Sequence, residues 1–376
     1  MLRFLTSGES HGQALMAILD GMPAGLKVTE EDINVELSRR QVGYGRGQRM
    51  QIEKDRVQII SGLRHGRTIA SPIGLMINNR DWENWQNKEI APVTAPRPGH
   101  ADLAGALKYG FSDIRDVLER ASARETAARV AVGAICKELL AEFQIAVFSR
   151  TVQIGQVKDA SVWELTGKEW QLIENSSVRC LSKKAEGEMI KLIDHAKKAG
   201  DTLGGVLEIV AVGVPAGLGS YTQWDLKLCS CLAQSLMSIQ AIKAVEIGLG
   251  TKVGELPGSR VHDAINYDKK GFGRSSNHAG GIEGGMSNGE NIVLRITMKP
   301  IATLLKPLSS VDIRSKKHVK ATVERSDVCA VPAVGVIAEN AVAFELARAL
   351  QGKLGGDSLT EMKRNFHGYM EQIKRF

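Results

Sequence analysis

A repeated pattern of apolar runs and turn signals constrains the fold of this chain more than any other feature. ALMAILDGMPAGLKVTEEDINVEL, residues 14–37, resembles GVLEIVAVGVPAGLGSYTQWDLKLC, residues 205–229. Each segment has a strand-like apolar run, then a Pro-Ala-Gly turn, then an aspartate (Asp32 or Asp225) that could cap a helix. We interpret the pair as a duplicated strand–turn–helix unit, which predicts two related halves.

A second and weaker similarity joins residues 62–79 to residues 284–300. Two occurrences do not make a solenoid, which needs at least three repeats. No Pro- or Ser-rich linker marks a domain boundary. We therefore expect one domain over residues 1–376, with its halves at roughly 1–200 and 201–376.

The periodicity of apolar residues predicts the main helices and strands. A capping-box pattern, Ser122 to Glu125, precedes one helix. The expected helices cover residues 122–143, 186–199, 225–246 and 338–353. The expected strands cover residues 57–61, 73–77, 145–154, 206–213 and 292–298, and the run ALMAILDG after residue 13 also looks like a strand. Since strands and helices do not alternate one by one, the pattern indicates an α+β fold with β-α-β halves rather than a parallel doubly wound sheet.

The formal net charge of +7 is less informative than its distribution. Arginines gather in RRQVGYGRGQR (residues 39–49) and RDVLERASARETAAR (residues 115–129), and arginine suits bidentate binding of carboxylate or phosphate. Lysine pairs elsewhere indicate solvated surface. A polyanion-binding protein is the alternative, but aromatics are only 5% and do not alternate with basic residues, which disfavours nucleic acid. A small, multiply charged anion fits better.

GESHG, residues 8–12, allows two chemical interpretations. It matches G-x-S-x-G, the nucleophile elbow of serine hydrolases, which would make Ser10 a nucleophile. An elbow needs a central strand before it and a helix after it. Here few residues precede the motif and a strand-like run follows it. The alternative is a glycine-hinged loop that presents His11 as a proton donor.

Other segments support chemistry on an anion. RPGHAD supplies His100 after a Pro-Gly turn, and the helix expected from Ser122 offers free N–H groups and a dipole to a phosphate. The glycine-rich segment 277–290 could lie against a ligand or form a surface loop. Histidine titrates near neutral pH, and a bound phosphate would favour its protonated form. No H-x-x-x-H or C-x-x-C spacing indicates a metal site.

The start of the chain lacks the apolar core of a signal peptide, and no uncharged stretch is long enough to span a bilayer. We expect a cytoplasmic protein without a membrane partner. The five cysteines are an odd number without metal-site spacing, which indicates buried thiols.

Taken together, the motifs resemble those of the chorismate synthase family over nearly the whole chain. They include GESHG, GYGRGQRMQIEKD, SGLRHGRTIASPIG, RPGHADLAGALKYG, ERASARETAARVAVGA, SNHAGGIEGGMSNGE, VERSDVCAVPA and GGDS, in that order. The resemblance implies a lyase that converts 5-enolpyruvylshikimate 3-phosphate to chorismate and phosphate by 1,4-elimination, the last shared step toward aromatic amino acids. It also implies a requirement for reduced FMN without net redox change.

The resemblance also implies roles for individual residues. His11, supported by Ser10, would protonate the departing phosphate, and His100 would protonate the reduced flavin. Asp357 of GGDS would assist flavin N5, which takes the C6 proton. Arg40, Arg46 and Arg49 would bind substrate anions or NADPH, and we favour substrate anions. The implied flavin contacts are Arg120, Ala121, Ser122, Gln240, Ala241, Gly284, Lys299, Pro300, Ile301, Ala302, Thr303 and Arg325.

The same resemblance implies a helical layer between antiparallel sheets and a homotetramer. Because no extra domain for flavin reduction is visible, we expect an external flavin reductase to supply reduced FMN. The chain departs from the usual family pattern at Ala70 and Ala244, where glycine is common, and at residues 311–321, which are more basic than usual.

Overall fold

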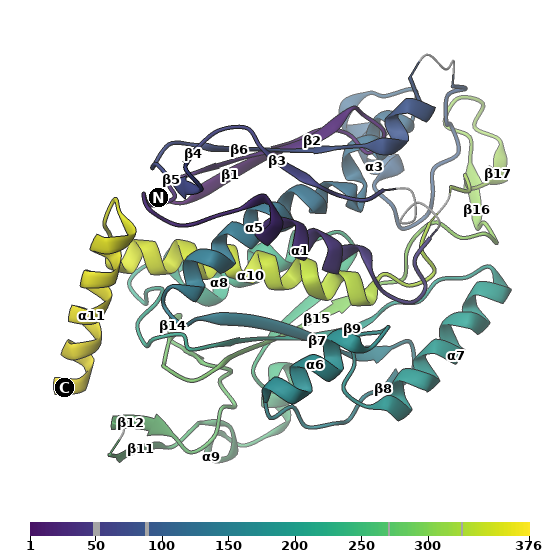
Figure 1. Cartoon of the computed structure of the whole chain (residues 1–376). Coiled ribbons are helices and arrows are strands. Elements are labelled where there is room, and N and C mark those ends of the chain that lie inside the picture. Colours follow the sequence, from purple (N-terminus) through teal and green to yellow (C-terminus); the bar gives the residue numbers. More distant parts are fainter. Residues whose placement is uncertain (48–52, 87–89, 270, 325) are drawn as a thin grey trace.

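Two antiparallel sheets lie on either side of a layer of helices (Figure 1). This computed structural model describes the chain except for residues 48–52, 87–89, 270 and 325. The mixture of helices and antiparallel sheets confirms the predicted α+β class.

The first sheet follows from strands whose residues alternate between a buried and an exposed face. In β2, Leu15, Ala17 and Leu19 are buried against the helices, whereas Met16 and Ile18 point outward. All neighbours are antiparallel. The strand order is β1 (Arg3–Ser7), β2 (Ala14–Asp20), β6 (Ile73–Asn78) and β3 (Val57–Ile59).

The second sheet is longer and its central strand is more deeply buried. In β9, the run from Leu207 to Ala211 has no exposed residue, so this strand is covered on both faces. Helices α6 and α7 cover the side turned away from the helical layer (Figure 1). The order is β10 (Ile242–Ile247), β15 (Ile292–Met298), β9 (Gly205–Val212), β7 (Ala146–Ile154) and β8 (Val157–Lys158).

Four helices form the layer between the sheets. Helix α10 packs on α5, α1, α8 and the second sheet, while α5 also packs on β2 and β6 of the first sheet. Since α10 has neighbours on all sides, nearly its whole circumference is buried and apolar. The helices are α1 (Glu30–Gln41), α5 (Thr126–Ala141), α8 (Leu228–Met237) and α10 (Val331–Leu354).

The remaining elements lie outside these three layers. Figure 1 shows α11 leaving the end of α10 and α3 beside the opposite end of the first sheet. The outer helices are α3 (Asp102–Tyr109), α4 (Arg115–Ala121), α6 (Gly167–Asn175), α7 (Lys183–Ala199), α9 (Gly258–Val261) and α11 (Leu359–Arg375). The hairpins are β4 (Leu63–Arg64) with β5 (Arg67–Thr68), β11 (Ile265–Asp268) with β12 (Gly271–Arg274), β13 (Ile282–Glu283) with β14 (Met286–Ser287), and β16 (Ser309–Val311) with β17 (His318–Lys320).

The repeated sequence pattern corresponds to a repeated topology. The orders β1-β2-β6-β3 and β7-β9-β15-β10 match strand for strand, with α1 and α8 in equivalent places and a small hairpin before β6 and before β15. The topological repeat changes over between α5 and β7, near residue 143. The division expected at residue 200 therefore does not coincide with it.

Two expected features of the helices are wrong. The helix expected over 225–246 ends at Met237, and β10 follows, because Ala241 takes a left-handed φ of 71° and β10 pairs with β15. The expected caps also differ. Thr29 caps α1 with Asp32 as the third residue of its capping box, and Asp225 lies in a short 3₁₀ turn.

The positions at which the chain departs from the expected family pattern have identifiable local structures. Ala70 has a φ of 61°, a left-handed conformation that favours glycine, the residue that the family resemblance leads us to expect at this position. Ala244 lies at a register irregularity between β10 and β15. Residues 311–321 run from the last residue of β16 through the exposed strand β17.

Candidate active site

The GESHG loop connects β1 to β2 within the first sheet. Only glycine fits at position 8, since its φ is +100° and a Cβ would lie 2.3 Å from the carbonyl oxygen of Ala14. Ser10 is 2% exposed, and its Oγ donates to Ser122 Oγ at 3.1 Å. A buried serine between two antiparallel strands contradicts the strand-to-helix context of a nucleophile elbow.

Within the described part of the chain, His11 is held by two neighbours through three contacts. Its backbone N–H donates to Glu119 Oε2 at 2.7 Å, and its Nδ1 lies 2.8 Å from Glu119 Oε1. Its ring stacks on Trp85 with the centroids 4.0 Å apart. Burial alone would raise the pKa of Glu119, but the hydrogen bonds from His11 outweigh it and lower that pKa. Glu119 is therefore a carboxylate where it meets His11.

Two buried polar residues, Asn79 and Arg124, hold the GESHG loop in place. Asn79 donates to the carbonyls of Glu9 and Gly12 and accepts from Arg124 Nε at 2.9 Å. Arg124 Nη1 also binds one oxygen of Asp55 at 2.6 Å. The loop is thus tied by hydrogen bonds to the start of α5.

Arg40 reaches the same point from α1. It is 4% exposed and donates to Asp55 Oδ2 at 3.2 Å, to Thr126 Oγ1 and to the carbonyl of Ala123. Burial and the charges of Arg124 and Arg46 lower the pKa of Arg40 to about 10, although Asp55 opposes the shift. The structure therefore places Arg40 as a buried support whose donors bind protein groups.

His100 repeats the arrangement of His11 with different residues. Its Nδ1 makes a short contact with Asp102 Oδ1 and lies 3.0 Å from Arg97 Nη2. Arg97 also binds Asp102 and donates to Thr303 Oγ1 at 2.9 Å. Burial would raise the pKa of Asp102, but the hydrogen bonds from His100 and Arg97 hold it well below its usual range. His100 thus also contacts a buried carboxylate through Nδ1.

The segment 299–303 lies directly beside the His100 loop. A Cβ on Gly99 would lie 3.8 Å from Ala302 Cβ and 3.9 Å from Lys299 Nζ. The backbone N–H of Lys299 donates to the carbonyl of Ala241 at 2.9 Å. Gln240, the next residue back, donates to Glu125 Oε2 at 3.3 Å. These contacts bring together residues that are far apart in the sequence.

Two features of this segment fit an anionic, hydrogen-bonding ligand. Burial, with the charge of Lys243, lowers the pKa of Lys299, so an anion beside these two cations would be stabilised. Gln240 Oε1 is buried and accepts no hydrogen bond from the part of the chain that the structure describes. Such an oxygen is costly to leave without a donor.

Residues before α10 close the arrangement. Ser326 Oγ donates to the carbonyl of Thr303 at 3.1 Å. Asp327 pairs with Arg46 Nη1 at 3.2 Å and accepts from the backbone N–H of Gly47 at 2.6 Å. Thr6 and Arg120 complete the circuit, because Glu125 accepts from Thr6, and Arg120 donates to the carbonyls of Thr6 and Gly8.

We call this set of contacts the contact ring. It includes residues that directly precede α5 and α10, and the dipole at a helix N-terminus favours negative charge. Its members from the expected site residues are Ser10, His11, Arg40, Arg46, His100, Arg120, Ser122, Gln240, Ala241, Lys299, Ala302 and Thr303, with Ala121, Pro300 and Ile301 between them in sequence.

Two expected site residues lie outside the contact ring. Asp357 follows the far end of α10, which at 24 residues is about 36 Å long, and its carbonyl accepts from Ala24 N. Gly284 lies in the β13–β14 hairpin, whose Gly285 binds the start of α8, while Gln240 follows the end of that helix. Arg49 and Arg325 lie outside the described residues.

The residues that position the two histidines were not among those expected from the sequence. Glu119 lies inside ERASARETAAR and Asp102 inside RPGHAD, but neither motif predicts a role for these two residues. A histidine two residues before an aspartate, as in His100 and Asp102, was the available signal. No local pattern joins Glu119 to His11 or Asp327 to Arg46, because those pairs form only in the folded chain.

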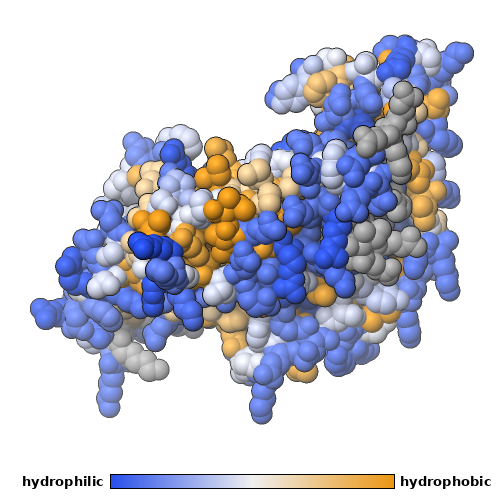
Figure 2. Space-filling model, turned by 45° about the horizontal axis from the view of Figure 1, so that its top comes forward, coloured by the Kyte–Doolittle hydropathy of each residue, from blue (hydrophilic) through white to orange (hydrophobic). Residues whose placement is uncertain are grey.

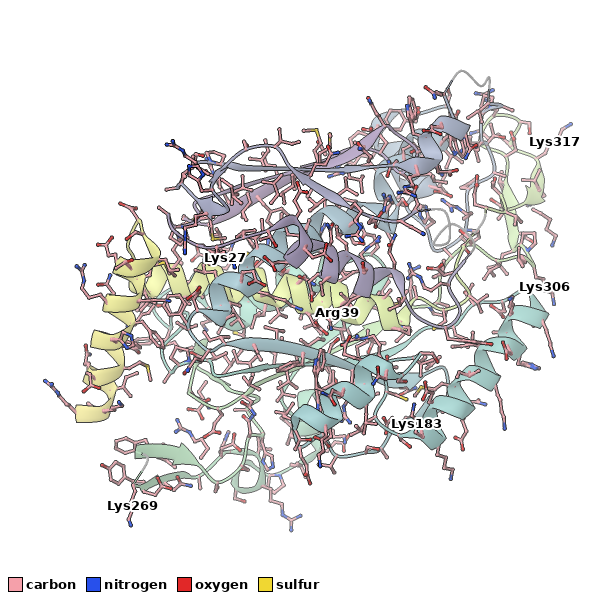
Figure 3. All side chains as sticks on the ribbon, in the orientation of Figure 1. Lys27, Arg39, Lys183, Lys269, Lys306 and Lys317 are labelled. Atoms are coloured by element: carbon pink, nitrogen blue, oxygen red, sulfur yellow. The ribbon has the colours of Figure 1, made fainter. Side chains whose placement is uncertain are left out.

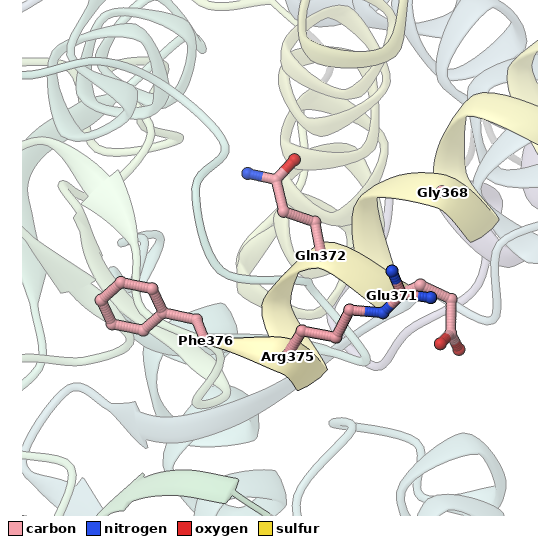
Figure 4. Close-up of a pocket in the computed structure, with 5 residues that line it drawn as sticks. All are labelled: Gly368, Glu371, Gln372, Arg375 and Phe376. Carbon is pink, nitrogen blue, oxygen red and sulfur yellow. The ribbon is translucent and has the colours of Figure 1, made fainter.

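Surface hollows lie elsewhere. One runs along α11 and is lined by Gly368, Glu371, Gln372, Arg375 and Phe376 (Figure 4). Because a single exposed helix lines it and none of its residues belongs to the contact ring, we assign it no chemistry. A second hollow contains Asp263 and His278, whose backbone N–H donates to Asp263 at 2.8 Å.

Charged residues outside the contact ring lie both at the surface and within the helical layer. Figure 3 shows Lys183, Lys306 and Lys317 at the periphery, whereas Arg39 lies within the helical layer. Among the described residues, no group of three or more His, Cys, Asp or Glu side chains is arranged to hold a metal ion. In the same part of the chain, no helix has both the length and the apolar character needed to cross a membrane.

Known proteins share both the sequence and the fold. The sequence profile of the chorismate synthase family matches residues 2–351. Proteins named chorismate synthase from Endomicrobium trichonymphae and Geobacter metallireducens are 57% and 54% identical, with full coverage of both chains. A solved structure titled "Crystal Structure of Chorismate Synthase" superposes with a TM-score of 0.83 at 44% identity, covering 100% of this chain and 99% of the other.

Proposed function

The chain belongs to the chorismate synthase family, and we propose that it converts 5-enolpyruvylshikimate 3-phosphate to chorismate and phosphate with reduced FMN as its cofactor. One observation carries the proposal. Two histidines from distant loops, each bound through Nδ1 to a carboxylate, belong to the contact ring together with the buried arginines Arg40 and Arg124 and the half-buried Lys299.

The contact ring fits the cofactor. Gln240 Oε1, which accepts no hydrogen bond among the described residues, suits a donor on the polar edge of a flavin. Lys299 beside Lys243 suits the phosphate of FMN. The left-handed backbone at Ala241 and the segment 299–303 would approach the same group. Reduced FMN, when bound, supplies the electron-rich ring on which the family's elimination depends.

His11 is the proton donor in this proposal. The elimination breaks the bond between C3 and the phosphate oxygen, together with the C6–H bond. A proton from His11 stabilises the departing phosphate, and acid catalysis of this kind is typically worth roughly 10²–10⁴ in rate. Ser10 supports the loop through Ser122, and His100 holds a proton beside the segment 299–303.

The substrate anions are the partners we assign to Arg46, supported by Arg40. Within the contact ring, Arg46 pairs with Asp327, while Arg40 pairs with the buried Asp55. Since arginine binds carboxylate and phosphate through several donors, these residues favour the substrate over NADPH. Arg49, outside the described residues, belongs to the same proposal.

We also propose a homotetramer in the cytoplasm that receives reduced FMN from an external flavin reductase. The apolar outer face of the first sheet supports assembly, because Leu5 is 77% and Ile18 is 49% exposed on neighbouring strands. Steady turnover with NADPH and oxidised FMN alone would contradict the external reductase.

The direct test is turnover without oxygen, with dithionite-reduced FMN and 5-enolpyruvylshikimate 3-phosphate. We expect chorismate absorbance and phosphate to appear together, and neither with oxidised FMN. His11→Ala should lower kcat about 10²–10⁴-fold, whereas His195→Ala, on the exposed side of α7, should match the wild type. A wild type that binds reduced FMN and substrate but makes no chorismate would refute the proposed function.

A further inference from the structure

We propose that Glu119 is the positioning residue that makes His11 a proton donor through its Nε2 atom. The inference rests on the proposed function. It assigns to Glu119 the task of holding the His11 ring, which the reaction alone does not assign to any residue. It concerns how the chain fixes one ring in one orientation and one protonation state.

Glu119 grips the loop at three points. Its two carboxylate oxygens accept from the backbone N–H of His11 at 2.7 Å and contact His11 Nδ1 at 2.8 Å. Its carbonyl oxygen accepts from the backbone N–H of Ser10 at 2.9 Å. A carboxylate that binds both the main chain and the ring of one residue fixes the side-chain rotamer relative to the backbone. Since Nδ1 is held, the transferable proton belongs on Nε2.

The surroundings keep the pair aligned. Trp85 stacks on the His11 ring, and Arg115 lies over Trp85 with its guanidinium carbon 5.2 Å from the ring centroid. Arg115 stands one helical turn before Glu119 on α4, and its charge contributes to the lowered pKa of Glu119. Among the described residues, the ionisable groups near His11 include Glu119 on α4, Arg115 behind Trp85, and Glu9 in its own loop.

The second histidine shows why Glu119 has a particular effect. Asp102 divides its carboxylate between His100 and Arg97, so a cation already balances it. Both oxygens of Glu119 instead accept from His11. A negative charge directed at one imidazole stabilises the protonated ring, which is the form that an acid needs.

Glu119→Gln is the decisive variant, because it keeps the size of the side chain and removes the charge. We expect kcat to fall about tenfold to a hundredfold with KM within about threefold. The alkaline limb of the kcat–pH profile should move to lower pH, because the variant lacks the negative charge beside the proton donor. Glu119→Asp should recover part of the rate and most of the pH profile.

Asp116→Asn is the matched control, since it removes one charge from the exposed side of the same helix. It should leave kcat and the pH profile unchanged. Wild-type kcat and pH profile in Glu119→Gln would overturn the inference, as would equal losses in Glu119→Asp and Glu119→Gln without a pH shift. If Glu119→Gln does not fold, Glu119→Asp decides, because its shorter side chain should lower kcat at unchanged KM, and a wild-type kcat in that variant would overturn the inference. An inactive wild type would instead refute the proposed function.

Discussion

Two aspartates are candidates for the carboxylate that would lie beside the proposed flavin. The family resemblance points to Asp357, which lies at the far end of α10 beside Ala24. The fold instead brings Asp327 to the contact ring, where it pairs with Arg46 at 3.2 Å and follows Ser326, which binds Thr303. The structure therefore favours Asp327 within one chain.

We predict that Asp327→Asn lowers kcat/KM by about tenfold to a hundredfold, since a charge-assisted hydrogen bond to Arg46 is lost. Asp357→Asn, an exposed carboxylate, should stay within about threefold of wild type. Initial rates of chorismate formation with reduced FMN check both. The reverse order would show that Asp357 acts in the reaction, which it could do only from a second copy of the chain.

At the scale of elements, a buried ion network joins the helical layer to the second sheet. Glu339 of α10 is fully buried and accepts from Arg39 at 2.8 Å and Lys137 at 2.7 Å, thereby linking α1, α5 and α10. Arg179 and Ser149 of β7 bind its other oxygen. Because Arg40 follows Arg39 on α1, the network also sets the position of the contact ring.

We predict that Glu339→Ala lowers the free energy of unfolding by about 3–5 kcal/mol, because three cations lose the buried carboxylate that they share and keep, among the residues that the structure describes, only Glu36 and Glu174 as counter-charges. Glu188→Ala, on the exposed face of α7, should change it by less than about 0.5 kcal/mol. Urea unfolding followed by circular dichroism measures both. Equal stability of the two variants would contradict a structural role for the network.

The same network fixes a direction of pH dependence. Burial would raise the pKa of Glu339, but Arg39, Lys137 and Arg179 outweigh it and hold that pKa below its usual range. A depressed pKa in the folded chain stabilises the fold above the ordinary glutamate range, and the benefit is lost as the pH falls below about 4.5. The difference between wild type and Glu339→Ala should therefore narrow as the solution is acidified.

Several elements could be predicted from the sequence because their signals are local. Helix α7 ends at Gly200, whose φ of 70° is the left-handed cap that glycine favours. Strands β6, β7, β9 and β15 appear within about one residue of their expected bounds. Their apolar periodicity is strong because one sheet face is always buried.

Other elements depend on contacts that a local pattern does not contain. The periodicity of residues 225–246 favours a long helix, but Ile242 to Ile247 pair with β15 instead. Helix α10 begins at Val331, seven residues before its expected start, with a proline in its first turn. The same limit applies to the site. His11 and His100 stand in recognisable motifs, whereas Glu119 meets His11 across 108 residues.

At the scale of the whole molecule, the two repeated halves differ in whether helices cover the outer face of their sheet. Helices α6 and α7 lie outside the second sheet, but the outer face of the first sheet carries apolar side chains that come forward in Figure 2. Leu5 lies opposite Ile18, and Met16 opposite Met76, so these residues adjoin across neighbouring strands. Strand β1 is also the edge of this described sheet. An apolar face beside an open edge fits a second copy of the chain.

We predict that Ile18→Lys dissociates the assembly, since a lysine in the centre of this face would bury a charge against apolar side chains. The particle mass from light scattering should fall toward that of one chain or a smaller assembly. Val162→Lys, at a residue that is 80% exposed between β8 and α6, should keep the wild-type mass. If both variants keep that mass, the outer face of the first sheet is not the interface. If Ile18→Lys dissociates and also loses turnover while still binding reduced FMN, the contact ring needs the neighbouring chain, and Gly284 and Asp357 become the residues to test in that neighbour.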